Sequence, residues 1–177
     1  MIEPVSGRIR VWDLPVRIFH WSLVACFATA WLSSDDAEAL HQWAGYLALG
    51  LVAIRTLWGF VGSRHARFSD FVPSPTDFCE YAGQALRGNE PRYLGHNPAA
   101  AVMILFLLSM IIFIGFSGWL MTTDMGWGND TLEEIHELAA ELALTAVVVH
   151  VAAAIYESVH QRENLVRAMI DGYKRAR

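Results

Sequence analysis

The sequence predicts an all-α integral membrane protein, a single domain over residues 1–177 that forms an up-and-down bundle of four transmembrane helices. Hydrophobic residues make up 54% of the chain and charged residues only 18%, whereas about a quarter of the residues of a soluble domain are charged. The apolar residues gather in four long segments, each of which can supply the ~20 residues of a spanning helix. The same composition excludes a disordered chain and a nucleic-acid-binding protein.

The four predicted spans differ in their polar content. The first is uninterrupted from Ile18 to Leu32, the second contains the single charge of Arg55, the third contains no charge, and the fourth begins with glutamates. Arginines before the first span also resemble the start of a secretory signal peptide. We favour a retained span, because three further spans follow. The expected ranges are about 15–32, 41–61, 99–121 and 132–159.

The basic residues predict the orientation of these spans. The 13 lysines and arginines lie near the first span's start, at Arg55, in the loop 63–98, and after the fourth span. The loops 33–40 and 122–131 contain none and are acidic. The positive-inside rule therefore places both termini and the loop 63–98 in the cytoplasm. Within that loop, Ser74-Pro75-Thr76-Asp77 predicts the start of a short interfacial helix that ends near Gly88.

Four histidines fall in or at the ends of the predicted spans: His20, His41, His136 and His150. His136 and His150 are fourteen residues apart in one segment, which gives roughly 21 Å of helical rise and nearly the same helix face. The direction of each span places His41 and His136 near the outer side of the membrane. It places His20 and His150 near the inner side, so the four histidines form two pairs matched in depth.

Two histidines that face each other from different helices suit a b-type haem held at both axial positions, which favours electron transfer over oxygen binding. The sequence therefore predicts two haem b groups, ligated by His20 with His150 and by His41 with His136. It contains no Cys-x-x-Cys-His motif for covalent haem attachment. A non-haem metal site assisted by Glu137 and Glu141 remains an alternative, as does interhelical hydrogen bonding by single histidines.

Two further residues are predicted to contact a haem. Gly45 lies one turn after His41 and would let the flat macrocycle approach the helix. Arg55 lies fourteen residues after His41 on nearly the same face, where it could pair with a haem propionate. The alternative for Arg55 is a side chain that extends to cytoplasmic phosphates. The remaining histidines are predicted to be solvated in cytoplasmic segments: His65, His96 and His160.

Several motifs resemble one known family, the bacterial cytochrome b561 and nickel-iron hydrogenase cytochrome b superfamily. They are VWDLPVRIFHW at 11–21, His41 with Gly45, GHNP at 95–98, and His136-Glu137 followed by His150. The resemblance covers nearly the whole chain. It implies a four-helix membrane bundle with two b haems, ligated between the first and fourth helices and between the second and fourth, and it implies quinone chemistry.

The resemblance implies a di-haem cytochrome of a respiratory chain in the bacterial cytoplasmic (inner) membrane, surrounded by membrane lipid. It would carry electrons between the quinone pool and a redox partner, for which we favour a periplasmic c-type cytochrome. One alternative is a superoxide:quinone oxidoreductase, although acidic outer loops would repel superoxide. Another is the membrane anchor of a larger hydrogenase- or dehydrogenase-type complex, although hydrogenase subunits of the family have a fifth helix. Candidates for proton exchange with quinone are His96, Glu137 and Glu141.

Overall fold

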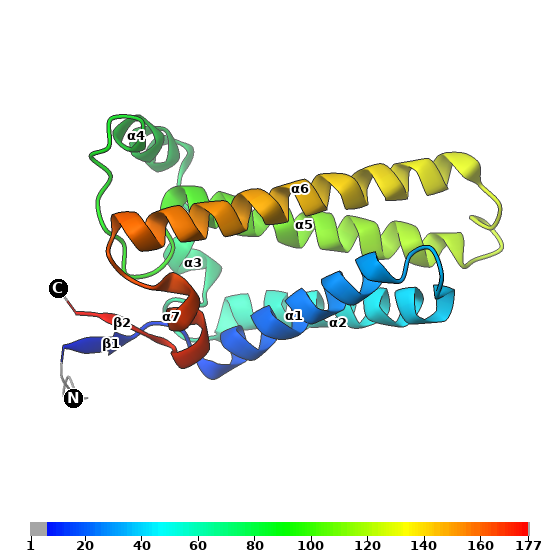
Figure 1. Cartoon of the computed structure of the whole chain (residues 1–177), viewed down its shortest axis with the longest axis horizontal. Coiled ribbons are helices and arrows are strands. Elements are labelled where there is room, and N and C mark those ends of the chain that lie inside the picture. Colours follow the sequence, from blue (N-terminus) through cyan, green and yellow to red (C-terminus); the bar gives the residue numbers. More distant parts are fainter. Residues whose placement is uncertain (1–6, 177) are drawn as a thin grey trace. The chain divides into compact units, whose positions relative to one another are not determined.

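The computed structural model describes residues 7–176, and Figure 1 traces their course. The expectation of a predominantly helical chain is confirmed, whereas the small two-stranded sheet was not predicted. The elements are β1 (Arg8–Arg10), α1 (Leu14–Leu32), α2 (Glu38–Val61), α3 (Phe68–Phe71), α4 (Pro75–Ala85), α5 (Pro98–Met121), α6 (Asp130–His160), α7 (Leu165–Asp171) and β2 (Tyr173–Arg175).

Three helices of the described chain are long and apolar enough to cross a membrane, namely α2, α5 and α6. They correspond to the second, third and fourth predicted spans. The first predicted span corresponds to α1, which has 19 residues but is not in this set. Its polar residues Arg17 and His20 lower its mean hydropathy. A fourth span through α1 therefore stays a prediction.

The chain divides into two compact units. Unit 1 comprises residues 7–17, 58–104 and 149–176, and unit 2 comprises residues 18–57 and 105–148. Helices α1, α2, α5 and α6 each contribute residues to both units. The single domain expected over 1–177 stays a prediction.

Unit 2 consists of helical segments that approach one another closely. A Cβ added to Gly115 of α5 would lie 3.2 Å from Leu49 Cδ1 of α2, so these two helices pack without room for a side chain there. Tyr46 and Thr122 join α2 to the end of α5 through hydroxyl oxygens 3.3 Å apart. The buried faces carry alanines at helical spacing, namely Ala44 and Ala48 on α2 and Ala139, Ala143 and Ala146 on α6.

In unit 1 the two ends of the chain meet. Strands β1 and β2 pair antiparallel, with Ile9 opposite Lys174. Val11 and Trp12 continue this contact, because their backbone N–H groups both donate to the Gly172 carbonyl, at 2.9 and 3.1 Å. Gly172 has φ +88, and a Cβ there would lie 2.7 Å from the Trp12 carbonyl oxygen. Only glycine meets both requirements without strain.

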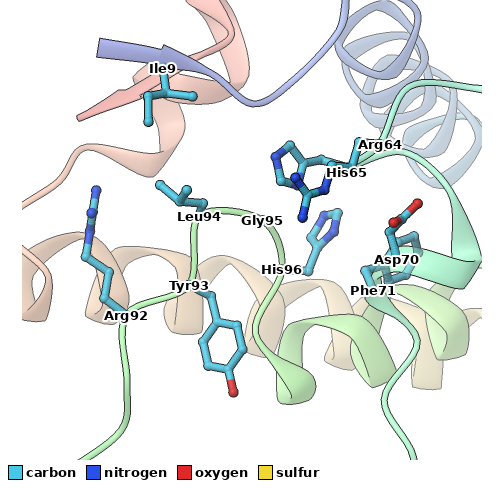
Figure 2. A pocket seen from close by; sticks show the side chains of 10 residues that line it. All are labelled: Ile9, Arg64, His65, Asp70, Phe71, Arg92, Tyr93, Leu94, Gly95 and His96. Atoms are coloured by element: carbon cyan, nitrogen blue, oxygen red, sulfur yellow. The ribbon is translucent and has the colours of Figure 1, made fainter. Parts of the chain in front are cut away.

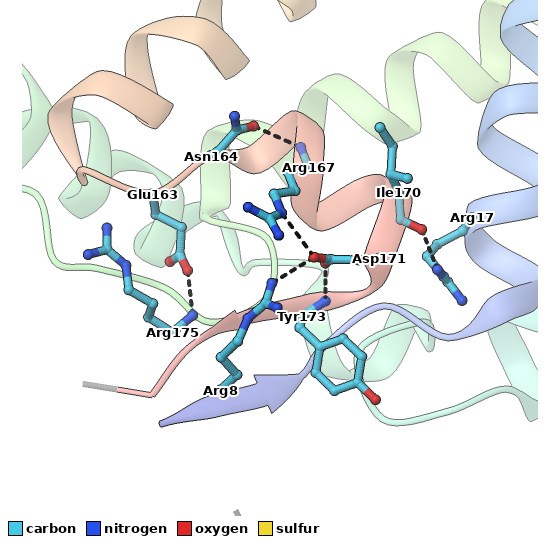
Figure 3. Close-up of polar contacts among 9 residues, drawn as sticks. All are labelled: Arg8, Arg17, Glu163, Asn164, Arg167, Ile170, Asp171, Tyr173 and Arg175. Carbon is cyan, nitrogen blue, oxygen red and sulfur yellow. Dashed lines mark hydrogen bonds and ion pairs between the residues drawn. The ribbon is translucent and has the colours of Figure 1, made fainter. Parts of the chain in front are cut away.

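Two carboxylates organise the C-terminal segment of unit 1 (Figure 3). Asp171 accepts hydrogen bonds from Arg8 at 2.6 Å and from the Tyr173 backbone N–H at 2.9 Å. Glu163 accepts from the Arg175 backbone N–H at 2.5 Å and from Arg92 at 2.6 Å. The contacts of Arg8 with Asp171 and of Arg92 with Glu163 join residues far apart in the sequence, so local patterns could not predict them.

The short helix predicted after Ser74 is confirmed as α4. Ser74 accepts a hydrogen bond from the Asp77 backbone N–H at 3.1 Å, and Asp77 accepts one from the Ser74 backbone N–H at 3.1 Å. This reciprocal capping box satisfies two backbone donors at the helix start. The helix ends at Ala85, and Gly88 follows with φ +67. The short helices α3 and α7 were not predicted.

Candidate functional site

The structure brings together one of the two predicted histidine pairs, inside unit 2. His41 lies in the first turn of α2 and His136 in the second turn of α6. The centroids of their imidazole rings are 6.1 Å apart and the rings are inclined at 71°. His136 is buried and His41 is half-buried. The two rings therefore face each other at the end of unit 2 where α2 and α6 begin.

Hydrogen bonds fix the tautomer of both rings. His41 Nδ1 lies 2.8 Å from the Ala30 carbonyl oxygen, and a carbonyl can only accept, so this nitrogen carries the proton. His136 Nδ1 lies 2.9 Å from the Ser117 hydroxyl oxygen. The same hydroxyl lies 3.0 Å from the Ile114 carbonyl oxygen, and when it donates there it accepts from His136 Nδ1. In both rings the lone pair is then on Nε2.

This arrangement fits two axial ligands of one haem iron. A histidine that binds a metal through one nitrogen usually donates its other N–H to a carbonyl or another acceptor, which orients the ring. At about 2 Å per metal–nitrogen bond, imidazoles on opposite sides of one metal have ring centroids about 6 Å apart. The observed separation of 6.1 Å matches this requirement. The centroid separation and the hydrogen bonds at both Nδ1 atoms fit bis-imidazole ligation, and ligation itself stays a prediction.

Glycines provide space beside both histidines. A Cβ added to Gly118 of α5 would lie 3.1 Å from His136 Cε1, so a larger residue there would push against the ring. A Cβ added to Gly45 of α2 would meet no described atom within 4 Å. Gly45 therefore borders open space one turn after His41. This location suits a flat cofactor, although the contact itself stays a prediction.

The second predicted histidine pair is divided between the two units. His20 belongs to unit 2 and His150 to unit 1, and both are half-buried. Their pairing at one haem stays a prediction. Arg55 is only 4% exposed, whereas a side chain extending to phosphates at the membrane surface would be exposed. This burial favours the propionate hypothesis for Arg55 over the alternative.

The non-haem metal alternative receives no support. Within residues 7–176, no group of three or more histidine, cysteine, aspartate or glutamate side chains is placed to hold a metal ion. Glu137 and Glu141, which would have assisted such a site, are exposed. Among the described residues, the His41–His136 pair therefore has no third protein ligand of this kind beside it.

The expectation that His96 is simply solvated is wrong. Its ring packs between Trp12, at 4.5 Å between centroids, and Phe71, at 4.9 Å. Sequence reasoning missed this because the three residues are far apart along the chain. His160 also has a partner, since its Nε2 lies 3.1 Å from Glu90 Oε1. His65 is half-buried rather than fully exposed.

Sequence reasoning also missed Ser117. A signal was present, because Ser117 is a polar residue near the end of a charge-free apolar segment, and polar side chains inside spans are usually engaged. The sequence alone could not name its partner, which lies on another helix.

Comparison with known proteins decides the family. The family model of prokaryotic cytochrome b561 matches residues 11–172. The chain belongs to the prokaryotic cytochrome b561 family. Membership makes it a membrane-bound b-type cytochrome, with haem b as cofactor and electron transport as its class of activity.

Curated relatives of this cytochrome align over nearly its full length. A probable Ni/Fe-hydrogenase B-type cytochrome subunit of Rhodobacter capsulatus is 27% identical over 98% of this chain and 84% of its own. A protein of the same name from Rhizobium leguminosarum bv. viciae is 24% identical, over 93% and 87%. The probable Ni/Fe-hydrogenase 1 B-type cytochrome subunit of Escherichia coli (strain K12) is 23% identical, over 93% and 89%. No solved structure matches this cytochrome.

Proposed function

We propose that this cytochrome carries electrons across the bacterial inner membrane between the quinone pool and a redox partner at the outer face. The observation that carries the proposal is the His41–His136 pair, with ring centroids 6.1 Å apart and both Nδ1 atoms engaged in hydrogen bonds. Haem b, when bound, supplies one-electron redox chemistry. Two histidines would hold this haem, which would favour electron relay over oxygen binding.

The chain's own residues hold and orient the two cofactors in this proposal. His41 and His136 would hold the outer haem, and the Ala30 carbonyl and the Ser117 hydroxyl would orient their rings. His20 and His150 would hold the inner haem. Arg55 would neutralise a propionate, and Gly45 would leave room for the macrocycle.

The turns beside the outer pair carry negative charge, which favours a partner with a positively charged surface. The α1–α2 turn carries Asp35 and Asp36, the α5–α6 turn carries Asp124, and α6 begins at Asp130; all four are exposed. An acidic face steers a basic partner towards it. We therefore propose a periplasmic electron-transfer protein with a basic docking face, such as a c-type cytochrome.

A second candidate is the cytochrome b subunit of a hydrogenase-type complex. It is favoured by the names of the relatives, which are called Ni/Fe-hydrogenase B-type cytochrome subunits. In this case the outer partner is a membrane-attached dehydrogenase, and α1, α2, α5 and α6 anchor it. Purification in mild detergent distinguishes the two candidates, because iron–sulfur and nickel subunits that copurify would support only the second.

Quinone exchange needs a titratable group that a lipid-dissolved molecule can reach. Glu137 and Glu141 are exposed on α6 close to His136, whereas His96 is held between two aromatic rings. The two glutamates are thus accessible to quinone at the outer side, whereas electron transfer across the membrane to an outer partner would need quinone to react at the inner pair.

A pyridine haemochrome assay on the purified protein tests the proposal. We expect two b haems per chain from two bis-imidazole sites, and the loss of one in each of His136→Ala and His150→Ala. His160→Ala is the matched control, because its histidine pairs with Glu90 in unit 1 and is not a predicted ligand. A wild-type protein without b haem, or ligand variants that keep both haems, would contradict the proposal.

A further inference from the structure

Unit 1 contains a cavity of about 610 Å³ that the haem proposal does not use. Its walls come from β1, from the segment that follows α2 and from the segment that precedes α5. Figure 2 shows Arg64, His65 and His96 close together in the cavity wall, with Arg92 further away. Two arginines and two histidines thus line one cavity.

The positive charges of this cavity exceed its negative charges. Arg64 is exposed and makes no ion pair with any residue in the range 7–176. The carboxylate in the wall, Asp70, is already paired with Arg67 at 2.8 Å. Arg92 is paired with Glu163 at 2.6 Å. An anion that binds Arg64 therefore breaks no salt bridge within the described chain, whereas an anion that binds Arg92 competes with Glu163.

Lys174 adds a further charge next to the cavity. Its Nζ donates to the carbonyl of the cavity residue Gly95 at 3.4 Å and lies 5.3 Å from the centre of the Trp12 ring. Burial lowers the pKa of Lys174 to about 8, so its side chain is still mostly protonated at pH 7.

His65 in the cavity wall lies near more positive than negative charge. Burial is the main cause that lowers the pKa of His65, and the nearby Arg64 and Lys174 lower it further, while Asp70 opposes them. An anion in the cavity would relieve this repulsion. It would also raise the pKa of His65, which gives the cavity a spectroscopic signature.

The cavity lies at the ends of two candidate membrane spans. Arg64 follows the last residue of α2, Val61, by three positions, and His96 precedes the first residue of α5, Pro98, by two. Both helices are candidate spans, so these residues fall at the level of the lipid headgroups. The apolar wall residues Ile9 and Leu94 would suit the glycerol region of a lipid.

We propose that this cavity binds the phosphate group of an anionic ligand, with Arg64 as its charge partner and His65 and His96 in the wall around it. The position at the membrane surface favours the headgroup of an anionic phospholipid, since basic pockets at the ends of transmembrane helices bind such headgroups. A soluble phosphate ester would offer the same chemistry to these residues. The inference does not depend on haem ligation.

The test uses the haem-loaded protein in lipid nanodiscs made of phosphatidylcholine with or without phosphatidylglycerol. Native mass spectrometry counts the phosphatidylglycerol molecules that stay bound after detergent release. A charge-assisted hydrogen bond is worth about 1.5–3 kcal/mol, so we expect Arg64→Gln to weaken retention by about 10-fold or more. Arg87→Gln is the matched control, because Arg87 is exposed in the same loop and does not line the cavity.

A second arm identifies the source of the phosphate. Glycerol 1-phosphate and inorganic phosphate are titrated separately while the pKa of the His65 imidazole is followed by NMR. A rise in this pKa with soluble phosphate, lost in Arg64→Gln, without selective lipid retention, would support the phosphate site with a soluble source. Retention of phosphatidylglycerol that depends on Arg64 supports the lipid source.

Two results would overturn the inference. One is equal binding of every probe by the Arg64→Gln and Arg87→Gln proteins. The other is binding of a quinone analogue that depends on Arg64, with no phosphate binding in either arm. The haem spectrum of each variant is recorded in parallel, so failure of the phosphate site is distinguished from failure of haem ligation.

Discussion

The Ser117 hydroxyl oxygen lies 2.9 Å from His136 Nδ1, and both atoms are buried inside unit 2. When the hydroxyl donates to the Ile114 carbonyl 3.0 Å away, it accepts from the histidine. Ser117 therefore keeps the proton on Nδ1 and presents Nε2 to a metal. It acts through His136 and is a positioning residue for the proposed outer haem.

Ser117→Ala should weaken haem retention at the outer pair by about 10- to 100-fold, the usual effect of losing a partner that orients a metal ligand. It should also shift the reduction potential of that haem, because a hydrogen bond at Nδ1 tunes the ligand's basicity. The measurements are haem content and a redox titration. Ser109→Ala is the control, since Ser109 is exposed on α5 and its hydroxyl donates only to the Leu105 carbonyl. Equal behaviour of the two variants would contradict a positioning role.

Gly45→Ala and Gly50→Ala form a matched pair on α2. At either position, an added Cβ meets no described atom within 4 Å, and alanine favours a helix over glycine by about 1 kcal/mol. If no haem lay beside either glycine, neither substitution would lower haem content. We expect Gly45→Ala alone to lower haem content, because the macrocycle would occupy the space beside Gly45. Normal haem content in the Gly45→Ala protein would contradict the prediction that Gly45 contacts a haem.

Asp13 joins the start of α1 to the end of α2 within unit 1. Its carboxylate accepts hydrogen bonds from the Val16 backbone N–H at 2.9 Å, from Trp58 Nε1 at 2.9 Å and from the Ser63 hydroxyl at 2.6 Å. Asp13→Ala removes a helix cap and two charge-assisted bonds, so we expect a loss of about 2–3 kcal/mol.

Asp13→Asn should be destabilised less than Asp13→Ala, because its amide oxygen can still accept from Val16. Thermal unfolding in detergent, followed by circular dichroism, measures both variants. An Asp13→Ala protein that melts with the wild type would show that these bonds contribute little to the stability of unit 1.

The predictable part of this protein is the part governed by local pattern. Apolar runs long enough to span a bilayer indicated α2, α5 and α6, and the Ser74–Asp77 capping box indicated α4. Loop charges and the direction of each span predicted that His41 and His136 lie at the same level, and the structure brings these two rings together. Each of these features depends on residues close together in the sequence or on the direction of a span.

The features that escaped prediction depend on tertiary contacts. Residues of β1 and β2 are separated by most of the chain, and three-residue strands carry too little alternation to be recognised. His96 was predicted to be solvated because no pattern in its own segment predicts that Trp12 and Phe71 contact it. Ser117 needed a partner on another helix before its role could be seen. Packing between distant segments, and not local propensity, determines all three.

Glu163 should make the junction between the 63–98 loop and β2 sensitive to acid. Burial tends to raise the pKa of its carboxyl group, but hydrogen bonds from the Arg175 backbone and from Arg92 outweigh burial and lower it below the ordinary value of 4.5. A carboxyl whose pKa is lowered by folding stabilises the folded state above its unfolded pKa. That stabilisation is lost as the pH falls from about 4.5 through the lowered folded value.

Glu163→Gln should lose roughly 2 kcal/mol at pH 7 and show a shallower loss of stability in acid. Amide hydrogen exchange at Tyr173–Arg175, measured between pH 7 and pH 3 and corrected for intrinsic rates, reports this junction directly. Glu80→Gln serves as control, because Glu80 is exposed on α4 and its carboxylate accepts a hydrogen bond from Gln84 within the same helix. If exchange in the Glu163→Gln protein follows the wild-type pH profile, then the contacts of Glu163 with Arg92 and Arg175 do not hold β2 in place.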